Sequence, residues 1–146
     1  MKRLTIAAAA LALCASANAG IYSDDMARCL VASTSQKDKT DLVRWIFANA
    51  SLHPDVASIS SLTPEIRDAL DRDVAALLER LLTDACRKQA AEAFKYEGAV
   101  AFQQSFGTLG QVAMQELMTD SNVANGFKTF AKYLDQSKLE SIGLGQ

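Results

Sequence analysis

The stretch TPEIRDALDRDVAALLERLLTDAC, residues 63–86, has the strongest helix signal in the chain. Thr63 is a favourable N-cap, and Pro64 suits the first helical position because its missing N–H would have no partner there. Apolar residues follow at steps of three or four, the spacing of one buried helix face. They are Ile66, Leu70, Val74, Leu77, Leu81 and Ala85. The pattern predicts a long amphipathic helix that packs its apolar stripe against other helices.

Two endings of this helix fit the sequence. It can continue to Lys95 and stop at Gly98, since glycine commonly ends helices. It can also break near Thr83, which is itself a candidate N-cap. The region 64–97 is therefore expected to be one helix or two. Cys86 lies beside the apolar stripe, so it can face a neighbouring helix.

Helical spacing of apolar residues extends over most of the remaining chain. The predicted helices cover residues 23–31, 40–53, 100–118 and 121–134, and a last turn or two covers residues 137–142. No stretch shows the sustained alternation of apolar and polar residues, or the Asn-Gly turn, that would indicate strands. We therefore expect an all-α protein that forms a single helical bundle of five or six helices.

Two glycines lie inside the helix predicted for residues 100–118. Each of them costs a helix about 1 kcal/mol relative to alanine. We expect Gly107 and Gly110 to permit the close approach of another backbone, with a kink in the helix as the alternative.

The N-terminal sequence MKRLTIAAAALALCASANAG has the pattern of an export signal. Two basic residues come first, residues 4–13 form an apolar core, and residues 17–19 provide the small-x-small site that signal peptidase recognises. The pattern predicts that residues 1–19 are a cleaved secretory signal peptide. Residues 20–146 then form the mature all-α domain.

A signal of this short kind is typical of bacteria, so we expect the mature protein in the periplasm. Secretion beyond the cell is one alternative. Anchoring as an outer-membrane lipoprotein through Cys14 is another, although Leu13 is larger than the small residue that such sites carry before the cysteine. No later stretch reaches about 18 consecutive apolar residues, so no transmembrane segment is expected in the mature chain.

Cysteine number and compartment together predict one disulfide. Cys14 leaves with the signal peptide, so the mature chain keeps Cys29 and Cys86. Two cysteines in an oxidising compartment most simply pair with each other. A structural metal site would need more cysteine or histidine ligands, and a redox-active pair is more often Cys-x-x-Cys. The expected Cys29–Cys86 disulfide would stabilise the fold by about 4 kcal/mol.

The net charge of the chain argues against two classes of partner. The full chain has a formal net charge of −2, and the signal peptide removes two basic residues from it. This sign argues against nucleic acid, whose phosphates require a basic surface. It also argues against simple electrostatic docking on anionic lipid. The expected partner is another periplasmic or secreted protein.

No sequence motif indicates a reaction. His53 is the only histidine, and Asp55 could orient it as the general base of a hydrolase. We favour a simpler interpretation, in which His53 lies at a helix C-terminus and interacts with the last carbonyl groups. The acidic residues of 65–73 mix with arginines at helical spacing, which predicts a solvated, salt-bridged face. We expect no catalytic residues, no metal site and no cofactor, and the protein is not predicted to be an enzyme.

Two sets of residues are candidate binding elements. Arg44 and Trp45 form the candidate partner-binding pair, because both residue types are common at interface hot spots. Exposure of Trp45 to solvent would favour an interface, whereas burial would make it a core residue. The candidate ligand-lining set comprises Phe102, Phe106, Phe127 and Phe130. Together these side chains could enclose an apolar cavity.

The stretches CLVASTSQKDKTDLVRWIFANASLHP (29–54) and KYEGAVAFQQSFGTLGQVAMQELMTD (95–120) resemble a group of small exported all-helical proteins of Gram-negative bacteria, whose function is uncharacterised. That resemblance implies location and fold and carries over no catalytic residues. The combination of export signal, all-α domain and one disulfide is also loosely similar, in architecture alone, to periplasmic immunity proteins that block type VI secreted cell-wall amidases.

The functional expectation is a periplasmic or secreted helical protein-binding module of the inhibitor or immunity type. The alternative is a small-molecule or lipid carrier, which would require the phenylalanine-lined cavity. A hydrolase that uses His53 is the least favoured reading.

Overall fold

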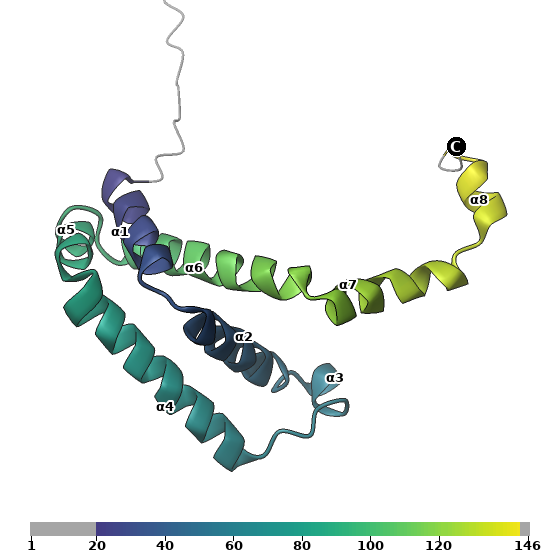
Figure 1. Ribbon diagram of the computed structural model, residues 1–146, viewed down its shortest axis with the longest axis horizontal. Helices are drawn as coiled ribbons and strands as arrows, with labels where there is room; N and C mark the ends of the chain where they lie inside the picture. Colours follow the sequence, from purple (N-terminus) through teal and green to yellow (C-terminus); the bar gives the residue numbers. More distant parts are fainter. Residues whose placement is uncertain (1–19, 144–146) are drawn as a thin grey trace, which may run out of the picture.

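The computed structural model describes residues 20–143, and every regular element in that range is helical (Figure 1). The α-helices are α1 (Ile21–Ala32), α2 (Gln36–Ala50), α3 (Pro54–Ala57), α4 (Pro64–Arg80), α5 (Arg87–Glu97), α6 (Ala99–Thr119), α7 (Ser121–Lys128) and α8 (Gln136–Glu140). A π-helical turn, Leu81–Ala85, joins α4 to α5, and a 3-10 helix, Thr129–Tyr133, follows α7. The predicted all-α class is confirmed. The predicted signal peptide and Cys14 lie outside the described residues.

The prediction of five or six helices is wrong, because the described chain contains eight α-helices. One extra helix is α3, a short helix that Pro54 starts directly after the end of α2. Another comes from the region 64–97, which is two helices rather than one. Length and apolar spacing identify long helices well, but they carry little signal for a helix of four or five residues.

The start of α2 also differs from its predicted start at residue 40. Ser35 and Asp38 form a capping box, in which the Ser35 side chain accepts a hydrogen bond from Asp38 N and the Asp38 side chain accepts one from Ser35 N. This reciprocal pairing satisfies two backbone N–H groups at the helix end. It therefore starts the helix at Gln36, four residues earlier than the apolar stripe indicates.

The π-helical turn explains how Cys86 reaches the interior. Cys86 N donates a hydrogen bond to Leu81 O at 2.8 Å, a step of five residues instead of four. One extra residue in the turn rotates the following chain relative to the α4 stripe. Ala85, the last predicted stripe residue, is consequently exposed, while Cys86 is fully buried.

The predicted pairing of Cys29 with Cys86 is present as a disulfide with a Cα–Cα distance of 5.8 Å. It joins the last turn of α1 to the residue directly before α5. Cys86 belongs to the same core cluster as Met26, Leu30, Leu81 and Leu109, which are fully buried. The disulfide therefore lies within the main core, where α1 packs on α5 and α6.

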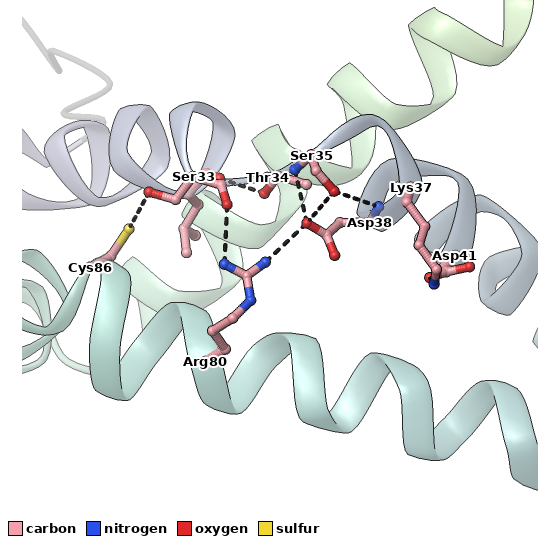
Figure 2. Close-up of polar contacts among 9 residues, drawn as sticks. Ser33, Thr34, Ser35, Lys37, Asp38, Asp41, Arg80 and Cys86 are labelled. Carbon is pink, nitrogen blue, oxygen red and sulfur yellow. Dashed lines mark hydrogen bonds and ion pairs between the residues drawn. The ribbon is translucent and has the colours of Figure 1, made fainter.

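Polar contacts fix the link between α1 and α2 (Figure 2). The Arg80 guanidinium donates to Ser33 O at 3.4 Å and pairs with Asp38 Oδ2 at 2.9 Å. Ser33 Oγ lies 3.7 Å from Cys86 Sγ, and the hydroxyl is the donor because a disulfide sulfur carries no hydrogen. Arg80 thus ties the end of α4 to the α1–α2 link and complements the disulfide nearby.

The described chain has two regions that differ in how they pack. Residues 20–119, the body, contain α1 to α6 and every buried side chain of the described chain. Residues 120–143, the arm, contain α7, the 3-10 helix and α8 and extend away from the body beyond the end of α6 (Figure 1). The arm is therefore outside the predicted single bundle. No helix in the range 20–143 has the length and apolar character needed to span a membrane.

Candidate functional site

A groove on the body lies where α2 passes α4 and α6, and its volume is about 230 Å³. Its lining side chains come from all three helices and are apolar. They are Leu42, Trp45 and Ile46 on α2, Val74 and Leu78 on α4, and Phe102, Phe106, Leu109 and Gly110 on α6. We call this feature the apolar groove. The buried members hold the helices together, and the half-buried ones leave an apolar wall in contact with solvent.

Trp45 lies at the rim of the apolar groove and is half-buried. Its Nε1 donates a hydrogen bond to Asp71 Oδ1 on α4 at 2.7 Å, which satisfies the polar edge of the indole ring. The rest of the ring lines the groove. Trp45 is thus neither fully exposed nor fully buried, and it packs against the core cluster.

Arg44 lies on a different side of α2 from Trp45. Its guanidinium is exposed and lies 3.9 Å from Asp41 Oδ1. It lines a second, more polar hollow of about 300 Å³ between α2 and α6, in which Lys39 pairs with Glu116 at 2.9 Å. The hydrogen bond from Lys39 holds the pKa of the Glu116 carboxyl below its usual value. The predicted Arg44–Trp45 pair is therefore divided between two surfaces.

The structure separates the four phenylalanines of the candidate ligand-lining set. Phe102 and Phe106 lie in the apolar groove with their ring centroids 4.3 Å apart. Phe127 and Phe130 lie on the arm, where they are 59% and 61% exposed. The two pairs do not form one cavity, because the arm leads away from the groove (Figure 1).

Gly110 shapes the apolar groove. A β-carbon added at Gly110 or at Gly107 would meet no atom within 4 Å. The expectation that these glycines permit close approach of another backbone is therefore wrong. Gly110 instead leaves a gap in the α6 wall of the groove, while Gly107 lies on the exposed side of the same helix.

Several groove residues were absent from the predicted binding sets, notably Leu78 on α4. A signal for them exists in the sequence, because Leu42 and Ile46, Val74 and Leu78, and Phe102 and Phe106 are pairs spaced by four residues. Such pairs lie on adjacent turns of one helix face. They show which faces are apolar, but only the packing shows that these three faces meet.

His53 occupies the N-cap of α3 rather than the end of α2. Its Nδ1 accepts a hydrogen bond from Asp55 N at 3.3 Å, and the Asp55 carboxylate lies 3.7 Å from the same atom. The imidazole is exposed and lines neither the apolar groove nor the polar hollow. Between residues 20 and 143 no group of three or more histidine, cysteine and acidic side chains is arranged to hold a metal ion.

Comparisons of the chain with protein-family models, with curated proteins and with solved structures found no match.

Proposed function

We propose that the protein is an exported helical module, of the inhibitor or immunity type, that binds another exported protein through the apolar groove. The observation that carries this proposal is the groove itself, an apolar strip formed by three helices with Trp45 at its rim. Protein interfaces commonly combine an apolar centre, an aromatic anchor and a polar rim.

The shape of the groove indicates which part of a partner would bind. A volume of about 230 Å³ is below the 300 to 1,000 Å³ that is usual for pockets that enclose small molecules. It suits one or two large apolar side chains that project from a partner helix. This size argues against the groove as a carrier site, and the exposed position of His53 outside the apolar groove and the polar hollow gives the hydrolase reading no support.

The charge of α4 indicates which charge the partner helix should carry beside its apolar face. Helix α4 carries five acidic and three basic side chains. Two of the arginines are engaged within the body, Arg67 with Ser51 Oγ and Arg80 with Asp38. Asp71 lies at the rim of the groove, where it accepts the hydrogen bond from Trp45. This carboxylate and the net negative charge of α4 favour a partner helix with basic residues next to its apolar face.

The two glycines of α6 allow a matched test. Gly110→Glu places a charged side chain in the groove, whereas Gly107→Glu places the same side chain on the exposed side of the same helix. Both sites have open space for a β-carbon, and both changes remove a glycine from a helix, so their effects on folding are similar.

The binding readout is a photo-crosslinker at Phe106, where p-benzoylphenylalanine keeps the aromatic ring. We expect irradiation of cells that export the protein to yield an adduct with a second exported protein. Gly110→Glu should reduce this adduct at least tenfold, and Gly107→Glu should leave it unchanged. Equal effects of the two glutamates, or no adduct in any background, would contradict the proposal. An adduct with twice the mass of the protein would contradict a foreign partner and would show that a second copy of this chain binds in the groove. The arm of such a copy carries apolar and basic residues of the expected kind.

A further inference from the structure

The N-terminus of α1 is capped by a residue from a distant part of the chain. Gly20 is the N-cap, and it has no side chain that could accept the first free N–H groups of the helix. The Glu97 carboxylate at the end of α5 accepts them instead, from Tyr22 N at 2.9 Å and Ser23 N at 2.9 Å. The Ser23 hydroxyl donates to the same carboxylate. This hydroxyl bond lowers the pKa of the Glu97 carboxyl.

The Glu97 carboxylate takes the place that the side chain of an ordinary N-cap residue would have. A β-carbon at position 20 would overlap the carboxyl group of Glu97. In an aspartate N-cap, the carboxyl group is bonded to this β-carbon, and its oxygens accept hydrogen bonds from the same second and third N–H groups. Position 20 must therefore be glycine for Glu97 to cap the helix.

The same geometry brings the backbone nitrogen of Gly20 close to the carboxylate. A backbone nitrogen lies about 2.5 Å from the β-carbon position of its own residue, and that position lies 2.1 Å from each Glu97 oxygen, so Gly20 N is no more than about 4.6 Å from these oxygens. A positive charge on this nitrogen would be unfavourable next to the positive end of the α1 dipole. A carboxylate at this distance offsets that repulsion.

We infer that the mature chain begins at Gly20 and that its α-ammonium group forms an ion pair with Glu97. The inference goes beyond the proposed function and rests only on its premise that the protein is exported. The pair would close the N-terminus of α1 onto α5, where the rings of Tyr22 and Tyr96 stack 4.5 Å apart.

The processing step is a hydrolysis by a signal peptidase. Water adds its hydroxyl to the carbonyl carbon of residue 19, the bond from this carbon to Gly20 N breaks, and the nitrogen takes the proton. Near neutral pH the new carboxyl group loses a proton and the new amine gains one. Before the cut Gly20 N is a neutral amide, so the ion pair exists only in the mature protein.

The first measurement is the intact mass and N-terminal sequence of the protein purified from the periplasm of its host. We expect the sequence to begin Gly-Ile-Tyr. Any other first residue would overturn the inference and leave the groove proposal unaffected, because the two concern different surfaces.

The second measurement tests the ion pair by a thermodynamic cycle on this purified protein. The α-amine is acetylated selectively at mildly acidic pH, where lysine side chains are less reactive because their pKa is higher. We expect acetylation to increase the unfolding equilibrium constant about threefold to fivefold when residue 97 is glutamate. In Glu97→Gln, which keeps an oxygen acceptor for the helix, acetylation should not increase this constant.

Glu92→Gln is the matched control, because Glu92 is a half-buried carboxylate on the same helix, outside this contact. It should respond to acetylation as the unchanged protein does. An equal response of the unchanged protein and Glu97→Gln to acetylation would overturn the ion pair.

Discussion

The body and the arm contain the same kind of secondary structure but differ in burial. In the arm, Asp120 caps α7 by accepting from Asn122 N and Val123 N, and Asp135 caps α8 by accepting from Ser137 N and Lys138 N. In the body, Thr63 caps α4 in a similar way. Yet the described residues after Ala113 include no buried side chain. Caps and local spacing are therefore sufficient to set helix positions, whereas the fold depends on side chains that bury apolar surface.

The largest expected change in the free energy of unfolding comes from removal of the disulfide, because the disulfide lies in the body and not in the arm. Cys29→Ala with Cys86→Ala should lower the free energy of unfolding by about 4 kcal/mol, because the open chain gains conformational entropy. Chemical denaturation followed by circular dichroism measures the change. The α-helix signal of the folded variant should stay near that of the parent, since the arm and the helix caps do not depend on the disulfide. An unchanged denaturation midpoint would mean that the disulfide does not stabilise the body.

The second prediction compares the loss of stability when a buried or an exposed apolar side chain is removed. Leu109→Ala in the body should cost about 3 kcal/mol, because it leaves a cavity where the side chain is 0% exposed. Phe130→Ala in the arm should change the free energy of unfolding by less than about 0.5 kcal/mol, because its ring is largely in water. Denaturant titration of both variants tests this order. A cost above about 2 kcal/mol for Phe130→Ala would show that the arm packs on the body in solution.

The smallest effect is the pH dependence of stability. The pKa of Glu116 in the body is lowered by its hydrogen bond from Lys39, and the pKa of Asp135 in the arm is lowered by its hydrogen bond from the Ser137 hydroxyl. A carboxyl whose folded pKa is below its unfolded value stabilises the fold above the unfolded pKa, and this stability is lost as the pH falls through the folded pKa.

Global unfolding should report only the carboxyl that belongs to the body. Glu116→Gln should weaken the loss of stability below about pH 4.5, the region where an unfolded glutamate takes up its proton. Asp135→Asn should leave that profile unchanged, because α8 can unfold without the body. Melting temperatures measured from pH 3 to pH 7 give the comparison. Equal changes in the two profiles would mean that body and arm unfold as one unit.

Much of the body could be predicted from residues close together in the sequence. Thr63 and Pro64 mark the true start of α4, and Leu70, Val74, Leu77 and Leu81 of the predicted stripe are buried. The pairing of Cys29 with Cys86 followed from the small number of cysteines. Predictions failed where a local signal competed with another one, as at the Ser35 capping box, or where a turn changed the helical phase, as at Leu81–Ala85.

Some residues of the candidate site could be predicted from the sequence, but the surface that they form together could not. Trp45, Phe102 and Phe106 were singled out by residue type, and they meet in the apolar groove. Phe127 and Phe130 are of the same residue type and are similarly spaced, but they lie on the arm and are exposed. Residue type shows that a side chain prefers to leave water, and it does not show which other surface it meets.

The sequence by itself determined the helical class, the main helix starts and the cysteine pair, because caps, apolar period and cysteine number act locally or by simple counting. Only the tertiary structure decided that α2, α4 and α6 form a groove, that Glu97 caps α1 from 77 positions after Gly20, and that the arm lies outside the core. These features depend on how helix faces pack in three dimensions. Such packing is set by the shapes and distances of side chains far apart in the sequence.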